Sequence, residues 1–122
     1  GADVTQYKVG DRVFPPLASG TFREEVRGKA AGCMPAPEGD AVQLSLLTVN
    51  GPTAEVLLED FADLAPGDWL IQNAANSSCG RYLIRLARIK GVRTVNVVRR
   101  AGMVDELREL GGDVVLVDGP DL

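Results

Sequence analysis

Short apolar runs alternate with helical patterns through the second half of the chain. The apolar runs have the length of strands, and they cover residues 69–71, 94–98 and 114–117. Helical periodicity covers residues 80–90 and 103–110, and a glycine follows each helix, at Gly91 and at Gly111. This order predicts an α/β fold, in which helices pack on a parallel β-α-β-α-β sheet.

The helix predicted over residues 80–90 is amphipathic. Its apolar side is made of Leu83, Ile84, Leu86, Ala87 and Ile89, and its other side carries Arg81, Arg85 and Arg88. Tyr82 is the one aromatic residue among the arginines, and the chain has a net charge of -4. We therefore interpret the arginine row as a solvated face and expect no nucleic-acid partner. No apolar run approaches the roughly 20 residues of a bilayer span, so we expect no membrane partner either.

Residues 1–40 have a different composition. They are rich in glycine and proline, and turn signals separate short runs that contain valine or phenylalanine. This pattern predicts the short strands of a small barrel or sandwich. This range ends in a proline- and glycine-rich connector, CMPAPEGD, at residues 33–40. A further helix is predicted from Pro52, and its apolar side would be made of Val56, Leu57, Phe61 and Leu64. The change of pattern places a boundary near Leu47.

The segment QNAANSSCG, residues 72–80, joins a predicted strand to a predicted helix. Dinucleotide-binding folds place a G-x-G-x-x-G loop there, because a pyrophosphate needs free N–H groups and a close approach to the backbone. The same spacing gives Ala75-x-Ser77-x-x-Gly80, so small residues replace two of the glycines. Asn76, Ser77 and Ser78 add side-chain donors. The alternative is an ordinary strand–turn–helix capped by Asn or Ser.

Arg99 and Arg100 follow the next predicted strand, where NAD-binding folds carry an acidic residue for the ribose 2′-hydroxyl. A guanidinium can bind a 2′-phosphate through paired N–H donors, whereas a carboxylate would repel it. If the loop binds a dinucleotide, the expected cofactor is NADPH rather than NADH. The alternative is that the two arginines serve surface solubility.

Three motifs carry a resemblance to a known family: VN-x-P-T-A at residues 49–54, QNAANS-x-x-G and TVNVVR. With them, the chain resembles the zinc-independent medium-chain dehydrogenase/reductases, and within that family the trans-2-enoyl-thioester (enoyl-CoA) reductases and quinone oxidoreductase-like proteins. The upstream YKVGDRVFP…SGTFREEV is similar to the GroES-like barrel of that superfamily. The resemblance implies a barrel remnant over residues 1–46 and the first half of an NADP-binding Rossmann domain over residues 47–122.

The resemblance also implies roles for individual residues. Asn50 and Thr53 would lie beside the nicotinamide, and Arg99 and Arg100 would hold the 2′-phosphate. The pyrophosphate site would be lined by Asn76, Ser77, Ser78 and Cys79, with Gly80 allowing close packing. The implied reaction is NADPH-dependent reduction of a carbon–carbon double bond conjugated to a carbonyl, in an enoyl thioester or a quinone. We expect the thiol of Cys79 to be buried and unreactive.

Cys33 and Cys79 are the only cysteines, and the chain contains no histidine. Their spacing suggests neither a disulfide framework nor a zinc site, so no metal is expected. With no signal-peptide pattern at the N-terminus, these features predict a protein of the reducing cytoplasm.

The family's tyrosine acid comes from a stretch upstream of anything in this sequence, and neither Tyr7 nor Tyr82 matches its motif. We therefore name no catalytic residue and expect a central fragment of a reductase that is inactive alone. Two alternatives stay open: a quinone oxidoreductase-like or alcohol dehydrogenase-like reductase, and a non-catalytic dinucleotide-binding or interaction module. Homo-oligomerisation also stays open.

Overall fold

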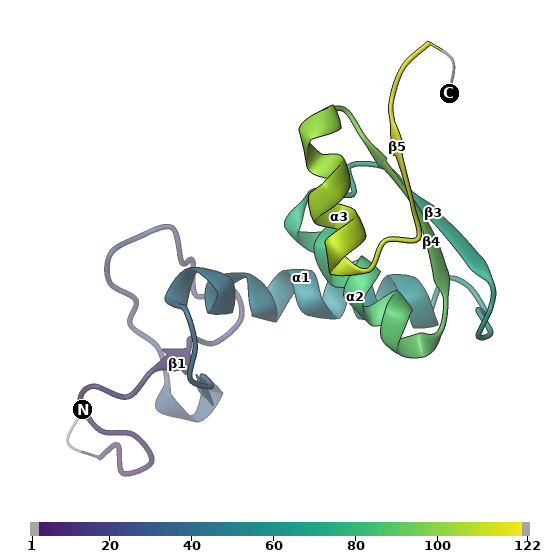
Figure 1. Ribbon diagram of the computed structural model, residues 1–122. Helices are drawn as coiled ribbons and strands as arrows, with labels where there is room; N and C mark the ends of the chain where they lie inside the picture. Colours follow the sequence, from purple (N-terminus) through teal and green to yellow (C-terminus); the bar gives the residue numbers. More distant parts are fainter. Residues whose placement is uncertain (1–2, 121–122) are drawn as a thin grey trace. The chain divides into compact units, whose positions relative to one another are not determined.

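The computed structural model describes residues 3–120 (Figure 1). The ends of both predicted domains, residues 1–2 and 121–122, therefore lie outside the described residues. The chain divides into two compact units, Gly1–Thr48 and Val49–Leu122.

The first unit contains little regular structure. Its two strands, β1 (Val13–Phe14) and β2 (Met34–Pro35), form one antiparallel pair, and a single 3-10 turn, η1 (Ala30–Gly32), precedes β2. Side chains hold the loops together: the Tyr7 hydroxyl donates to the Cys33 carbonyl at 2.8 Å. The predicted barrel remnant is thus reduced to one short ladder within the described residues. Strand propensity is a property of each short segment, whereas a strand forms a ladder only where a second strand lies beside it. A sequence pattern typical of strands therefore does not ensure a sheet.

Helix α1 (Ala41–Glu59) is longer than predicted, because it begins at Ala41 rather than at Pro52. Asp40 caps it: its side chain accepts a hydrogen bond from the Gln43 N–H at 3.0 Å. Pro52, which was expected to open the helix, lies inside it. Proline has no N–H to donate to the carbonyl four residues earlier, yet the helix continues through this position.

The predicted apolar side of this helix was also wrong. Ala54 and Leu58 are its buried residues, whereas Val56, Leu57 and Phe61 are exposed. The helix ends at Glu59, so Phe61 lies beyond it. Within the second unit, the buried residues of α1 therefore lie on a different side of the helix from Val56 and Leu57.

The second unit is built on a three-stranded parallel sheet, as the sequence predicted. Its strands are β3 (Trp69–Gln72), β4 (Arg93–Val98) and β5 (Val114–Val117), in the order β3-β4-β5. Helix α2 (Ser78–Lys90) connects β3 to β4. The turn η2 (Ala101–Met103) and helix α3 (Val104–Leu110) connect β4 to β5. Figure 1 shows α2 and α3 beside the strands, in the arrangement of a partial Rossmann fold.

Two apolar clusters form the core of the second unit. The first consists of Ala54, Leu58, Leu83, Ala87 and Val92, and the second of Ala75, Ile84, Val98, Leu107 and Val115. Both clusters include residues of α2, so this helix is packed on two sides. Ile89, which was placed on the apolar side of α2, is instead 80% exposed. Gly91 and Gly111 both adopt left-handed conformations and end α2 and α3 as predicted.

Candidate nucleotide-binding site

The loop between β3 and α2 turns at an alanine. Ala74 has a φ of 47°, in the left-handed region that glycine adopts more readily. The next residue, Ala75, is fully buried, and its N–H donates to the Val97 carbonyl at 3.2 Å. The Ser77 N–H donates to the Ala74 carbonyl at 2.9 Å. These bonds hold the loop against the end of β4.

Ser77 is the N-cap of α2. Its hydroxyl oxygen accepts a hydrogen bond from the Gly80 N–H at 3.1 Å, and its carbonyl accepts one from the Arg81 N–H at 3.0 Å. The N–H groups of Ser78 and Cys79 come before this first intrahelical bond, so the helix itself supplies them with no acceptor. Together with the helix dipole, they make this end of α2 favourable for an anion.

Gly80 allows the helix to approach the loop closely. A Cβ at this position would lie 2.6 Å from the carbonyl oxygen of Ala75 and 2.9 Å from its Cα. Both are backbone atoms, which cannot rotate away as the end of a flexible side chain could. The first turn of α2 therefore lies against Ala75 as the third glycine of a dinucleotide loop would allow.

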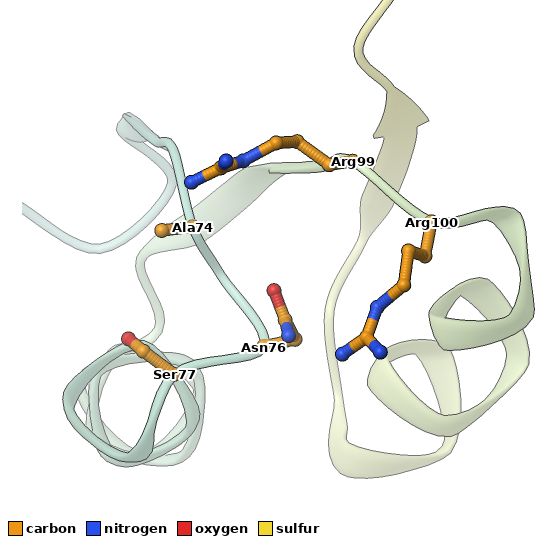
Figure 2. Close-up of a pocket in the computed structure, with 5 residues that line it drawn as sticks. All are labelled: Ala74, Asn76, Ser77, Arg99 and Arg100. Atoms are coloured by element: carbon orange, nitrogen blue, oxygen red, sulfur yellow. The ribbon is translucent and has the colours of Figure 1, made fainter.

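A pocket of about 520 Å³ opens beside this loop. Of the described residues, five line it: Ala74, Asn76, Ser77, Arg99 and Arg100. Figure 2 shows the Arg99 side chain extended toward Ala74, and the Arg100 side chain on the other side of Asn76. The segment after β4 thus brings two guanidinium groups to one opening beside the loop. With the N-terminus of α2, they give the pocket a positive character that suits phosphate groups.

Arg81 fixes the loop from the helix side, although the sequence placed it on a solvated face. Its Nε donates to the Asn76 carbonyl at 3.0 Å, and its guanidinium forms an ion pair with Glu106 of α3. The hydrogen bond between the two side chains lowers the pKa of Glu106 and raises the pKa of Arg81. Spacing along α2 could not reveal this partner, which lies 25 residues away.

The predicted residues lie in three places. Asn76, Ser77, Arg99 and Arg100 line the pocket, whereas Ser78 and Cys79 lie half-buried in the first turn of α2. Cys79 packs against the first apolar cluster as a free cysteine. Asn50 and Thr53 lie on α1 and do not line this pocket. The Thr53 hydroxyl donates to the Val49 carbonyl at 2.7 Å.

Within residues 3–120, His, Cys, Asp and Glu do not gather in groups of three that could hold a metal ion. No helix in that range is long and apolar enough to cross a membrane.

Comparison with known proteins gives strong matches at both the sequence and the structure level. The mitochondrial enoyl-[acyl-carrier-protein] reductase of Caenorhabditis elegans is 39% identical over 122 residues, covering 95% of this chain and 36% of that protein. The human mitochondrial enzyme is 39% identical over 124 residues, covering 97% and 33%. The chain thus spans about a third of the length of these curated relatives. No family model matches the chain.

Solved structures match over nearly the whole chain. A mutant enoyl thioester reductase from Candida tropicalis matches with a TM-score of 0.81 at 27% identity, covering 96% of this chain and 37% of that one. A putative NADPH:quinone reductase from Bacillus thuringiensis has the same TM-score at 30% identity, covering 96% and 36%. A mycobacterial protein solved with NADPH has a TM-score of 0.81 at 28% identity, covering 98% and 37%.

The fold, the loop and these matches define a class: the chain is homologous to the medium-chain dehydrogenase/reductases, as the motifs predicted. Within that class, its curated relatives are enoyl-thioester reductases of the mitochondrial type.

The prediction of a cytoplasmic protein was wrong. The curated relatives from nematode, slime mould, human and plant are all mitochondrial enzymes. Two unpaired cysteines indicate a reducing compartment at most, and they do not distinguish one such compartment from another.

Proposed function

We propose that this chain forms the NADPH-binding part of an enoyl-thioester reductase. The observation that carries the proposal is a pocket that brings Arg99 and Arg100 together with Ser77, the N-cap of α2. The names of the relatives support the reaction, and the mycobacterial structure with NADPH supports the cofactor. The division into a barrel remnant over residues 1–46 and a Rossmann part over residues 47–122 stays a prediction.

The pocket residues fit the phosphates of this cofactor. The N–H groups of Ser78 and Cys79 would bind the pyrophosphate at the N-terminus of α2. The exposed guanidinium groups of Arg99 and Arg100 would bind the 2′-phosphate through charge-assisted hydrogen bonds. No carboxylate lines the described pocket, so nothing there favours the 2′-hydroxyl of NADH over the 2′-phosphate.

When bound, NADPH would supply a hydride to the β-carbon of an α,β-unsaturated thioester. The electron pair of the double bond then moves to the carbonyl oxygen, and a proton is needed at the α-carbon. Among the described residues we assign no group to that proton transfer. Asn50 and Thr53 remain the proposed neighbours of the nicotinamide end. The Thr53 hydroxyl donates its hydrogen to Val49, so it could act toward a ligand only as an acceptor.

Isothermal titration calorimetry with NADPH and with NADH tests the cofactor. We expect NADPH to bind more tightly, and Arg99→Asp to weaken its binding about 10- to 100-fold, because charged hydrogen bonds are worth about 1.5–3 kcal/mol. Arg85→Asp, at an exposed position of α2 outside the pocket, is the matched control for the change in charge. Equal affinity for the two cofactors would overturn the 2′-phosphate assignment, and no binding of either would overturn the nucleotide site.

A quinone is the second candidate substrate, because the Bacillus thuringiensis protein has the same TM-score and 30% identity. In the reductase of which this chain would form the NADPH-binding part, oxidation of NADPH can be followed with crotonyl-CoA and with a benzoquinone in parallel. Faster turnover of crotonyl-CoA would support the enoyl-thioester assignment. Turnover of the quinone alone would replace it.

A further inference from the structure

Asn96 is a buried polar residue in the central strand that the proposed function does not use. Its side chain is fully buried, and it lies between β3 and β5. Its Nδ2 donates to the Thr94 hydroxyl oxygen at 2.9 Å and to the Val114 carbonyl at 3.1 Å. A Cβ on Gly112 would lie 2.8 Å from this Nδ2, so the chain packs closely over the amide. A buried amide is retained without cost only when its hydrogen bonds are made, as they are here.

Gln72 is the partner of Asn96 and leads to the loop. Its Nε2 donates to the Asn96 Oδ1 at 2.8 Å and to the Gly80 carbonyl at 3.1 Å. Gln72 lies opposite Asn96 in the parallel ladder, at the last position of β3 before the loop. The two amides therefore connect β5, through β4 and β3, to the first turn of α2.

The two backbone carbonyls at the ends of this row of hydrogen bonds determine which side-chain atom donates in each bond. The carbonyls of Val114 and Gly80 can only accept, so an NH₂ group must face each of them. Asn96 must then present its oxygen to Gln72, and Gln72 uses both of its Nε2 hydrogens. Neither amide can be turned over without losing two hydrogen bonds. The arrangement is thus a single oriented chain of donors.

The hydrogen bonds from Asn96 and Gln72 reach the candidate site at the Gly80 carbonyl. Gly80 also donates its N–H to the Ser77 cap, and its Cα lies too close to Ala75 for any side chain. We propose that Gln72, held by Asn96, is a positioning residue that fixes the first turn of α2, and with it the N–H groups that face the cofactor's pyrophosphate. This inference rests on the proposed NADPH site.

The variant Gln72→Met tests the proposal, because methionine keeps the length of the side chain and removes both donors. Gln43→Met, at an exposed position of α1, is the matched control. We expect Gln72→Met to weaken NADPH binding about 3- to 10-fold, as for the loss of one net hydrogen bond. Binding of 2′-AMP, which has no pyrophosphate, should not change.

Amide hydrogen exchange gives a readout that needs no cofactor. In Gln72→Met the amides of Gly80 and Arg81 should exchange about tenfold faster, which matches the same loss of one hydrogen bond. The amide of Ala87, further along α2, should not change. Equal acceleration at all three amides would mean a general loss of stability and would overturn the positioning role.

Two further outcomes separate this proposal from the NADPH site itself. If the wild-type chain binds no NADPH, the proposed function fails, while the exchange result still decides the role of Gln72. If the wild type binds and Gln72→Met binds equally well, the positioning role fails alone. Should the variant not fold, slow exchange of the Gln72 side-chain amide hydrogens in the wild type supports the proposal, and exchange as fast as in a free glutamine overturns it.

Discussion

Replacing Gly80 by alanine tests the close contact between α2 and the loop that precedes it. The new Cβ would lie 2.6 Å from the Ala75 carbonyl oxygen and 2.9 Å from two further backbone atoms of that residue. An ordinary contact needs more than 3.4 Å, so helix or loop must move by close to 1 Å. Such a shift would loosen Ile84, which is fully buried in the second cluster, and would disturb the hydrogen bond from Gln72.

The expected loss of stability can be worked from two opposing effects. Overpacking in a core costs about 1–3 kcal/mol, and backbone contacts place this site in the upper part of that range. Alanine is a better helix former than glycine by up to about 1 kcal/mol. The free energy of unfolding should therefore fall by about 1–2 kcal/mol.

Urea denaturation followed by far-UV circular dichroism measures this change. Gly102→Ala is the control, because a Cβ at position 102 meets no atom within 4 Å. The control should stay within about 0.5 kcal/mol of the wild type. A Gly80→Ala variant as stable as the wild type, or more stable, would refute the close contact and the reason given for this glycine.

Three other changes give distinct outcomes. Leu107→Ala should lower the free energy of unfolding by about 2–5 kcal/mol in the same assay, because the side chain is fully buried; a loss no larger than that of the exposed Leu17→Ala would contradict this. Lys90→Met should raise the pKa of Glu59, followed by NMR, because the hydrogen bond and charge of Lys90 now lower it. In the wild type, the Glu59 carboxylate stabilises the fold above the usual glutamate pKa, and this stabilisation is lost as the pH falls through the lowered pKa. An unchanged titration of Glu59 in Lys90→Met would contradict the pair. Arg81→Lys should weaken NADPH binding about 2- to 10-fold in calorimetry, since lysine cannot hold both the loop carbonyl and the carboxylate on α3; unchanged affinity would show that this clamp is dispensable.

The second unit was predictable from the sequence because its signals are local and agree with one another. The apolar positions Leu83 and Ala87 repeat with a helical period and are buried, and Gly91 ends the helix in a left-handed conformation. The strand Val114–Val117 has the predicted bounds. Where a periodic apolar pattern ends at a stop signal such as Gly91, the helix predicted from the local sequence is also the one that the fold requires.

The start of α1 was missed because two local signals competed. Pro52 is typical of a helix N-terminus, while Asp40 with Gln43 three residues later is a capping pattern. The structure follows the earlier signal, and Asp40 caps the helix. The large exposed residues of α1 added to the error, since its buried positions are Ala54 and Leu58.

The polar contacts of the site could not be predicted from spacing. Gln72 and Asn96 are 24 residues apart, and only the register of two parallel strands places them opposite each other. The pairing of Arg81 with Glu106 depends in the same way on how α2 meets α3. Such contacts follow from tertiary packing, which one sequence does not specify position by position.

The left-handed turn at Ala74 has a consequence for the entropy of binding. A glycine at positions 74 and 75 would leave the unfolded loop free to sample many more backbone conformations, each of which must be given up on ordering. Alanine restricts that freedom in advance, at the cost of some strain at a φ of 47°. In the folded protein the loop is already held by the bonds from the Ala75 N–H to the Val97 carbonyl and from the Ser77 N–H to the Ala74 carbonyl. Under the proposed function, binding of the cofactor should therefore require little further loss of conformational entropy.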